Sequence, residues 1–161
     1  MINESSEFSL QVDAVKGLCP PGEAWAKQHM EEGNIPVISC EGPCVRGDIA
    51  RMVANMIAEE APYARCCYQE AFGVPHSAMA KWVKDESDQI VMIDGCFLTC
   101  VGRILNNQIE HDKIIHFDIL PMYDKYKDYF AMDEVPVEER QAVARKVADK
   151  LLVMLKEKMT S

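Results

Sequence analysis

The chain has 161 residues, of which 48% are hydrophobic and 27% are charged, which is the composition of an ordinary globular protein. This length is enough for one hydrophobic core and too short for two large domains. The formal net charge of -9 argues against nucleic acid and anionic membranes as partners. Metal ions, small molecules or proteins, including a second copy of the chain, are the partners that we expect.

The sequence also indicates a compartment. Residues 1–10 lack the basic start and apolar run of a secretory signal, and the sequence has no run of about twenty apolar residues that could cross a membrane. We therefore expect a cytoplasmic protein, in which its seven cysteines remain reduced thiols. Their clustering at the ends of expected strands favours metal ligation or thiol chemistry over simple packing.

Residues 1–34 are expected to form an extension packed on the main domain, with a short helix over 23–32. Residues 35–161 are expected to form one α/β domain, with strands at 35–39, 63–65, 90–93 and 113–120. Helical spacing predicts helices at 49–57, 77–84 and 101–105, and a long terminal helix carrying Val143, Val147, Leu151 and Leu155. Strands that alternate with amphipathic helices predict an open, mainly parallel sheet of about four strands, doubly wound as in Rossmann-like and flavodoxin-like folds.

The most informative segment is an apolar strand followed by a turn with two thiols. Residues 90–93 read Ile-Val-Met-Ile, and Asp94-Gly95-Cys96 follows directly, with Cys100 in the first turn of the next expected helix. The side chain of Asp94 is expected to shape this turn, and Gly95 to give the backbone the freedom that lets the two thiols approach.

Thiols follow two other expected strands as well. The cysteines at strand ends are Cys40, the pair Cys66 and Cys67, and Cys96. Because loops at the carboxyl ends of parallel strands lie along one edge of a sheet, Cys40, Cys96 and one of the paired cysteines are expected to lie together, with Cys100 nearby. Zinc binds cysteine sulfur at about 2.3 Å in a tetrahedral arrangement. The pattern therefore predicts a zinc site, with packing as the simpler role for one cysteine of the pair.

From about residue 35 to residue 120 the chain resembles the DGC-domain family, named for the Asp-Gly-Cys found here at 94–96. The family pattern has a cysteine after the first strand, another after the second, and Ile-Asp-Gly-Cys followed by a last cysteine. The resemblance implies a zinc site of four chelating thiols, from Cys40, Cys66 or Cys67, Cys96 and Cys100. Two features depart from the pattern. The first loop reads Cys40-Glu41-Gly42-Pro43-Cys44, with Glu41 where a serine is more usual, and the middle cysteine is doubled. The choice between Cys66 and Cys67 and the participation of Cys44 therefore stay open.

A phosphatase is the second interpretation. Cys40 and Arg46 are separated by five residues between a strand and a helix, which looks like the phosphate loop of low-molecular-weight tyrosine phosphatases. In that chemistry Cys40 is the nucleophile, and Arg46 with the loop N–H groups holds the phosphate. Gly47 stands where those enzymes carry a hydroxyl, and Cys96 and Cys100 are left without a role. The metal site is therefore the preferred hypothesis.

A third interpretation is thiol redox chemistry, or delivery of metal or sulfur to a protein partner. The aromatic residues Tyr123, Tyr126, Tyr129 and Phe130 could form the docking surface, although aromatics at helical spacing more often belong to a core. Among the four histidines, His76 is the best reserve ligand because it follows the second cysteine cluster. His116 is expected to be solvated or hydrogen bonded.

Overall fold

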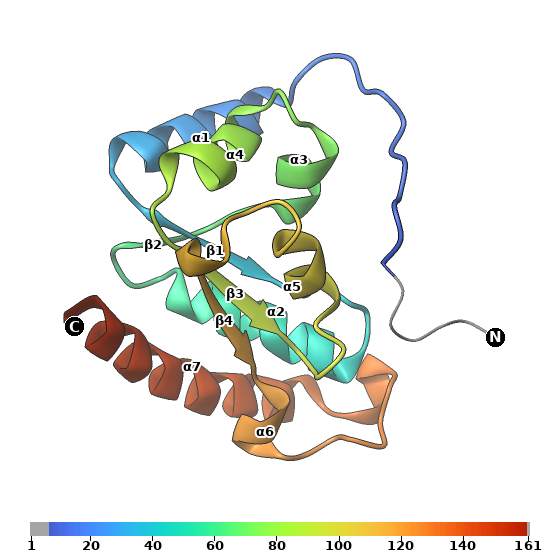
Figure 1. Cartoon of the computed structure of the whole chain (residues 1–161). Coiled ribbons are helices and arrows are strands. Elements are labelled where there is room, and N and C mark those ends of the chain that lie inside the picture. Colours follow the sequence, from blue (N-terminus) through green and yellow to red (C-terminus); the bar gives the residue numbers. More distant parts are fainter. Residues whose placement is uncertain (1–6, 161) are drawn as a thin grey trace.

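The computed structural model describes residues 7–160, so the expectations for residues 1–6 and 161 lie outside the described residues. One parallel sheet runs through the molecule in the order β2-β1-β3-β4 (Figure 1). Its strands are β1 (Ile35–Ser39), β2 (Tyr63–Arg65), β3 (Ile90–Asp94) and β4 (Ile114–Asp118). The expected open, parallel α/β sheet of four strands is confirmed.

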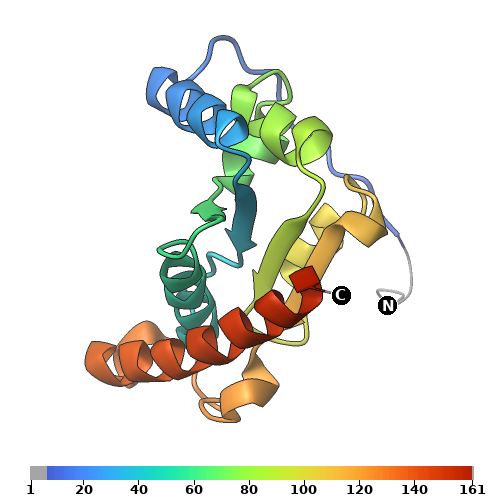
Figure 2. The ribbon, with the colours of Figure 1, turned by 90° about the vertical axis from the view of Figure 1, so that its left-hand side faces the viewer.

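Helices connect the strands and cover both faces of the sheet (Figure 2). The α-helices are α1 (Pro20–Glu31), α2 (Val45–Ile57), α3 (Tyr68–Gly73), α4 (Ala78–Lys81), α5 (Cys100–Leu105), α6 (Leu120–Tyr123) and α7 (Val137–Thr160). A π-helical turn extends α4 over Trp82–Glu86, and short 3-10 turns lie at His111–Lys113 and Met132–Glu134. Within residues 7–160, none of the helices combines the length and the apolar character needed to cross a membrane.

The alternation of side chains along the strands divides the core into two layers. Val37, Val91 and Ile93 face α2 and α7, whereas Ile38 and Met92 face the helices on the other side, α1 and α3–α5. All five residues of β3 are buried, as expected for a central parallel strand covered on both faces. Burial of each large apolar side chain there contributes about 2 kcal/mol to stability.

Helix α1 packs closely on the α4 side of the sheet. The indole N–H of Trp25 donates to the carbonyl of Arg65 at 2.9 Å, and His29 stacks against Trp82 with ring centroids 5.5 Å apart. Ala26 of the same helix is fully buried. Residues 20–31 therefore contribute directly to the second core layer, and residues 7–19 before them form no regular element.

Several elements differ from the sequence expectation. The strand expected over 113–120 ends at Asp118, because Pro121 occupies the first turn of α6. Helix α3 was not expected from the sequence, since its six residues are too few to show a period. The aromatic residues from Tyr123 to Phe130 do not share one helix, because Asp124 and Tyr126 have φ of 49° and 62° and break it.

Candidate functional site

The loops after β1 and β3 lie next to each other, at the point in the sheet where the connections to the next strands turn in opposite directions. From β1 the chain leaves through α2 toward β2, and from β3 it leaves through α5 toward β4 on the opposite side. Such a switch point opens a crevice at the carboxyl ends of the two strands, where open α/β sheets bind ligands. Cys40 follows β1 and Cys96 lies just past β3, and the N–H of Cys40 donates to the carbonyl of Ile93 at 2.9 Å.

Asp94 organises the β3 loop from a buried position. Its carboxylate is 1% exposed and accepts the N–H groups of Gly102 at 3.0 Å and Val101 at 3.4 Å, so it caps α5. Nε2 of His116 lies 2.8 Å from the same carboxylate. The expectations that Asp94 shapes this turn and that His116 is hydrogen bonded are both confirmed. The first turn of α5, which contains Cys100, is thereby fixed against β3 and β4.

Two glycines allow close backbone approaches at this edge: Gly95 lets the β3 loop touch the start of α2, and Gly47 lets α2 lie against the loop after β1. A Cβ atom on Gly95 would lie 2.4 Å from the carbonyl oxygen of Arg46, and one on Gly47 would lie 2.4 Å from that of Gly42. Backbone atoms cannot move aside cheaply, so both positions require glycine. The Asp-Gly-Cys turn thus packs its glycine directly against the first turn of α2.

The Cys40 sulfur lies within this contact between loops. Burial raises the pKa of the Cys40 thiol, whereas the nearby backbone N–H groups of Gly42 and Gly95 act to lower the pKa. The charges of Asp94 and Cys44 raise it further. A cation bound beside the sulfur would oppose these raising effects and favour the thiolate.

A salt bridge holds the loop after Cys40 in place. Glu41 accepts hydrogen bonds from Arg65 and, at 2.7 Å, from the hydroxyl of Ser39. Arg65 also donates to the Val37 carbonyl and to the Ser39 hydroxyl, each at 3.0 Å. The Glu41 carboxylate, which occupies the position where the loop departs from the DGC pattern, is therefore engaged in fixing β1 to β2.

The other cysteines differ in accessibility. Cys66 is buried in the second core layer, and burial raises the pKa of its thiol. Cys67 is exposed directly before α3 and points its sulfur toward Gln69 at 3.5 Å. Cys96 is half-buried, and Cys100 is exposed at the start of α5.

The pKa values of two tyrosines are affected by the charges of nearby cysteines. Burial raises the pKa of Tyr68, and the charges of Cys40, Glu41, Cys67 and Cys100 raise it further. Burial also raises the pKa of Tyr123, the Arg46 charge lowers it, and the charges of Cys44, Asp118 and Cys96 raise it. The buried Tyr123 hydroxyl has no hydrogen-bond partner among residues 7–160.

Cys44 was left open by the sequence and lies close to Cys40. The Cys40 and Cys44 sulfurs are 3.5 Å and 3.8 Å from the point where a Cβ atom on Gly42 would stand. Cys44 also precedes α2, and its sulfur accepts the N–H of Gly47 at 3.3 Å. The sequence does hold a signal for Cys44, because three residues separate it from Cys40, as three separate Cys96 from Cys100.

The donor chemistry of this edge suits a soft cation such as zinc, because thiols and backbone N–H donors to sulfur are concentrated there. Within residues 7–160, no three His, Cys, Asp or Glu side chains are grouped closely enough to hold an ion as they stand. Binding would require the thiol side chains on these loops to rotate toward one another.

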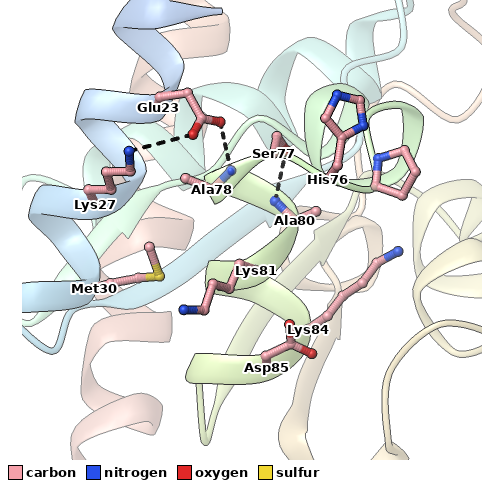
Figure 3. Close-up of a pocket in the computed structure, with 11 residues that line it drawn as sticks. Glu23, Lys27, Met30, His76, Ser77, Ala78, Ala80, Lys81, Lys84 and Asp85 are labelled. Carbon is pink, nitrogen blue, oxygen red and sulfur yellow. Dashed lines mark hydrogen bonds and ion pairs between the residues drawn. The ribbon is translucent and has the colours of Figure 1, made fainter. Parts of the chain in front are cut away.

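The reserve histidine, His76, has a different environment. Its Nε2 lies 3.1 Å from the carbonyl of Gly17. It lines a surface pocket of about 380 Å³ between α1 and α4 (Figure 3). The other lining residues are Glu23, Lys27, Met30, Pro75, Ser77, Ala78, Ala80, Lys81, Lys84 and Asp85, so no cysteine accompanies His76 there.

The chain was compared with known proteins. No curated protein and no solved structure matches the chain. The DGC domain matches residues 36–147, which is well over half of the chain and includes all the strand-end cysteines. The Asp-Gly-Cys of that domain is the turn at residues 94–96 that caps α5 and packs against α2. The chain therefore belongs to the DGC-domain family.

Proposed function

We propose that this chain binds zinc through cysteine thiolates at the carboxyl edge of its parallel sheet. The observation that carries the proposal is the meeting of the Cys40 and Cys96 loops at the switch point between β1 and β3. The candidate ligands are Cys40, Cys96, Cys100 and one of Cys66 and Cys67. Of that pair the exposed Cys67 is favoured, because desolvation of the buried Cys66 opposes its thiolate.

The number of thiolates would decide what the ion does. Four sulfurs close the tetrahedron of a structural or regulatory zinc, whereas three leave a position for water and Lewis-acid chemistry. The exposure of Cys67 and Cys100 means that the last ligands lie at the surface. Such a site fits a cytoplasmic protein, whose thiols stay reduced and free to bind metal.

The first prediction is stoichiometric zinc. Protein purified without a histidine tag is expected to contain about one zinc per chain, or to take up that amount from solution. Thiols must lose their protons to bind, so titration of metal-free protein with zinc should release protons. Elemental mass spectrometry and calorimetry in buffers of different ionisation enthalpy measure the two quantities. Protein that stays metal-free in excess zinc would contradict the proposal.

The phosphatase is the second candidate, and one observation favours it. Arg46 lies in the first turn of α2, directly after the loop that carries Cys40, which is where a phosphate loop places its arginine. A zinc-bound thiolate is no free nucleophile, however, and in the metal-free protein burial raises the pKa of the Cys40 thiol, which favours the less reactive protonated form. The prediction is negligible hydrolysis of an aryl phosphate, with or without a chelator. Robust hydrolysis by metal-free protein, lost in Cys40→Ser and in Arg46→Ala, would reverse the ranking.

Metal delivery or thiol redox exchange with a protein partner is the third candidate. Tyr129 and Phe130 are 45% and 66% exposed, and the carbonyl of Phe130 accepts the N–H of Val45 next to Cys44. Exposed aromatic side chains beside the thiols would suit a docking partner. Zinc that remains bound when an apo acceptor protein with cysteine ligands is added in excess would count against delivery.

A further inference from the structure

A stretch of the chain before α1 has the sequence pattern of a β-strand but forms none. Residues 8–12, called the alternating stretch here, are apolar at Phe8, Leu10 and Val12 and polar at the two positions between them. Such alternation is typical of a strand with one buried face. The three apolar side chains are instead 84%, 80% and 67% exposed, and the stretch belongs to no regular element. The pattern therefore indicates a strand whose neighbour is missing from the single chain over residues 7–160.

The sheet has two outer strands, and the outward side of β2 is already occupied. The carbonyl of Arg65 accepts the indole N–H of Trp25 at 2.9 Å. The N–H of Tyr63 donates to the carbonyl of Glu60, also at 2.9 Å. β2 is only three residues long. Helix α1 and a turn thus take up the backbone groups that an added strand would need at β2.

The outward side of β4 is open, because this strand has a neighbour, β3, on one side only. The N–H of Ile119 donates to the carbonyl of Asp94, which pairs in register with Asp118. Backbone groups of successive residues in a strand point to alternate sides, so those of His116 and Asp118 point away from β3. His116 is an exposed residue although only 27% of its side chain is exposed, so its main chain is open to solvent.

The two faces of β4 match the two faces of the alternating stretch. β4 presents Ile115 and Phe117 to the core layer that contains α2 and α7. His116 and Asp118 point to the opposite face of the sheet. A strand added beside β4 can therefore lay its apolar side chains next to Ile115 and Phe117 and its polar ones next to His116 and Asp118. Both segments are five residues long, and β4 contains neither the proline nor the lysine that often protects an open strand edge.

We propose that two copies of the chain form a dimer in which the alternating stretch of each adds as a fifth strand beside β4 of the other. The stretch leaves its own fold at the wrong place for its own β4, because α1 bonds to β2 at the opposite side of the sheet. In Figure 1 the stretch, in dark blue, runs along the right of the view and apart from β4. Each copy supplies one stretch and one open strand, so a two-fold dimer pairs both with identical contacts. Neither segment contains a cysteine, so the dimer does not depend on the proposed zinc site.

Light scattering after gel filtration tests the proposal with substitutions along the stretch. The natural chain is expected to be a dimer. Leu10→Lys and Val12→Lys place a charge on the apolar face of the added strand and are expected to give monomers. Ser9→Lys and Gln11→Lys add the same charge one residue away, on the polar face, and should remain dimers. All four side chains are exposed in the single chain, so the substitutions should leave the fold of the domain intact.

Amide hydrogen exchange, followed by NMR, locates the contact. The outward N–H groups of His116 and Asp118 should exchange at least about tenfold more slowly in the natural chain than in Leu10→Lys. A monomeric natural chain would overturn the proposal, and slow exchange in that monomer would show that the stretch pairs with its own β4. A dimer that survives in Leu10→Lys and Val12→Lys, or that is lost equally in the Ser9 and Gln11 variants, would also overturn it. So would a dimer in which both amides exchange fast, since its interface must lie elsewhere.

Discussion

Replacing Cys96 by serine is expected to abolish stoichiometric zinc binding. A serine hydroxyl keeps the size of the side chain but does not ionise near neutral pH, so it cannot replace a thiolate in the tetrahedron. Cys96 is half-buried and follows β3 at the switch point. Cys40→Ser and Cys100→Ser are expected to have the same effect. Zinc content per chain after gel filtration measures it.

Cys19→Ser is the matched control for these variants. Cys19 is exposed immediately before α1, far in sequence from the sheet edge, and its side chain makes no cap hydrogen bond. The Cys19→Ser variant should keep the full zinc content and the stability of the natural chain. Retention of full zinc content in both Cys96→Ser and Cys100→Ser would refute the assignment of the β3 loop to the site.

Replacing Asp94 by alanine is expected to destabilise the metal-free protein by about 3 kcal/mol. The substitution removes the acceptor of two backbone N–H groups at the start of α5 and the partner of His116. Leaving buried donors unpaired costs about 1–3 kcal/mol each, and the partial exposure of His116 lets water recover part of its loss. Denaturant unfolding in the presence of a chelator measures the change.

Asp94→Asn should cost much less than Asp94→Ala, since an amide oxygen can still accept from Gly102. Asp88→Ala removes a carboxylate from an exposed position and should change stability by less than about 0.5 kcal/mol. Equal stability of Asp94→Ala and Asp88→Ala would show that the Asp94 cap does not hold α5. Loss of the cap should also weaken zinc binding, because Cys100 begins that helix.

The strands could be predicted closely because burial on both faces leaves continuous apolar runs. The strand at 35–39 has the expected bounds, and the one expected over 90–93 gains only Asp94. Helix boundaries depended on contacts that the sequence does not display. Helix α2 begins at Val45, four residues before the apolar period starts at Ile49, because the Cys44 sulfur caps it by accepting the N–H of Gly47. The N–H of Val45 also donates to the carbonyl of Phe130, far along the chain.

The edge of the sheet at which the strand-end cysteines lie could also be predicted, because the carboxyl ends of parallel strands all lie at the same edge. The positions of the sulfurs relative to one another could not be predicted, because they depend on how the two loops pack against each other. Gly95 against Arg46 and the Glu41 link to Arg65 set the position of Cys40, and both are contacts between residues far apart in sequence. Nothing in the sequence indicates that the buried Tyr123 hydroxyl lacks a hydrogen-bond partner among residues 7–160.

X-ray absorption at the zinc edge of the untagged protein tests the thiolate site most directly. Cysteine ligation predicts a first shell dominated by sulfur at about 2.3 Å, with three or four sulfurs per zinc. The sulfur shell should lose amplitude or disappear with the metal in Cys96→Ser. A first shell of nitrogen and oxygen alone, at about 2.0–2.2 Å, would contradict a site built from the cysteines of the sheet edge.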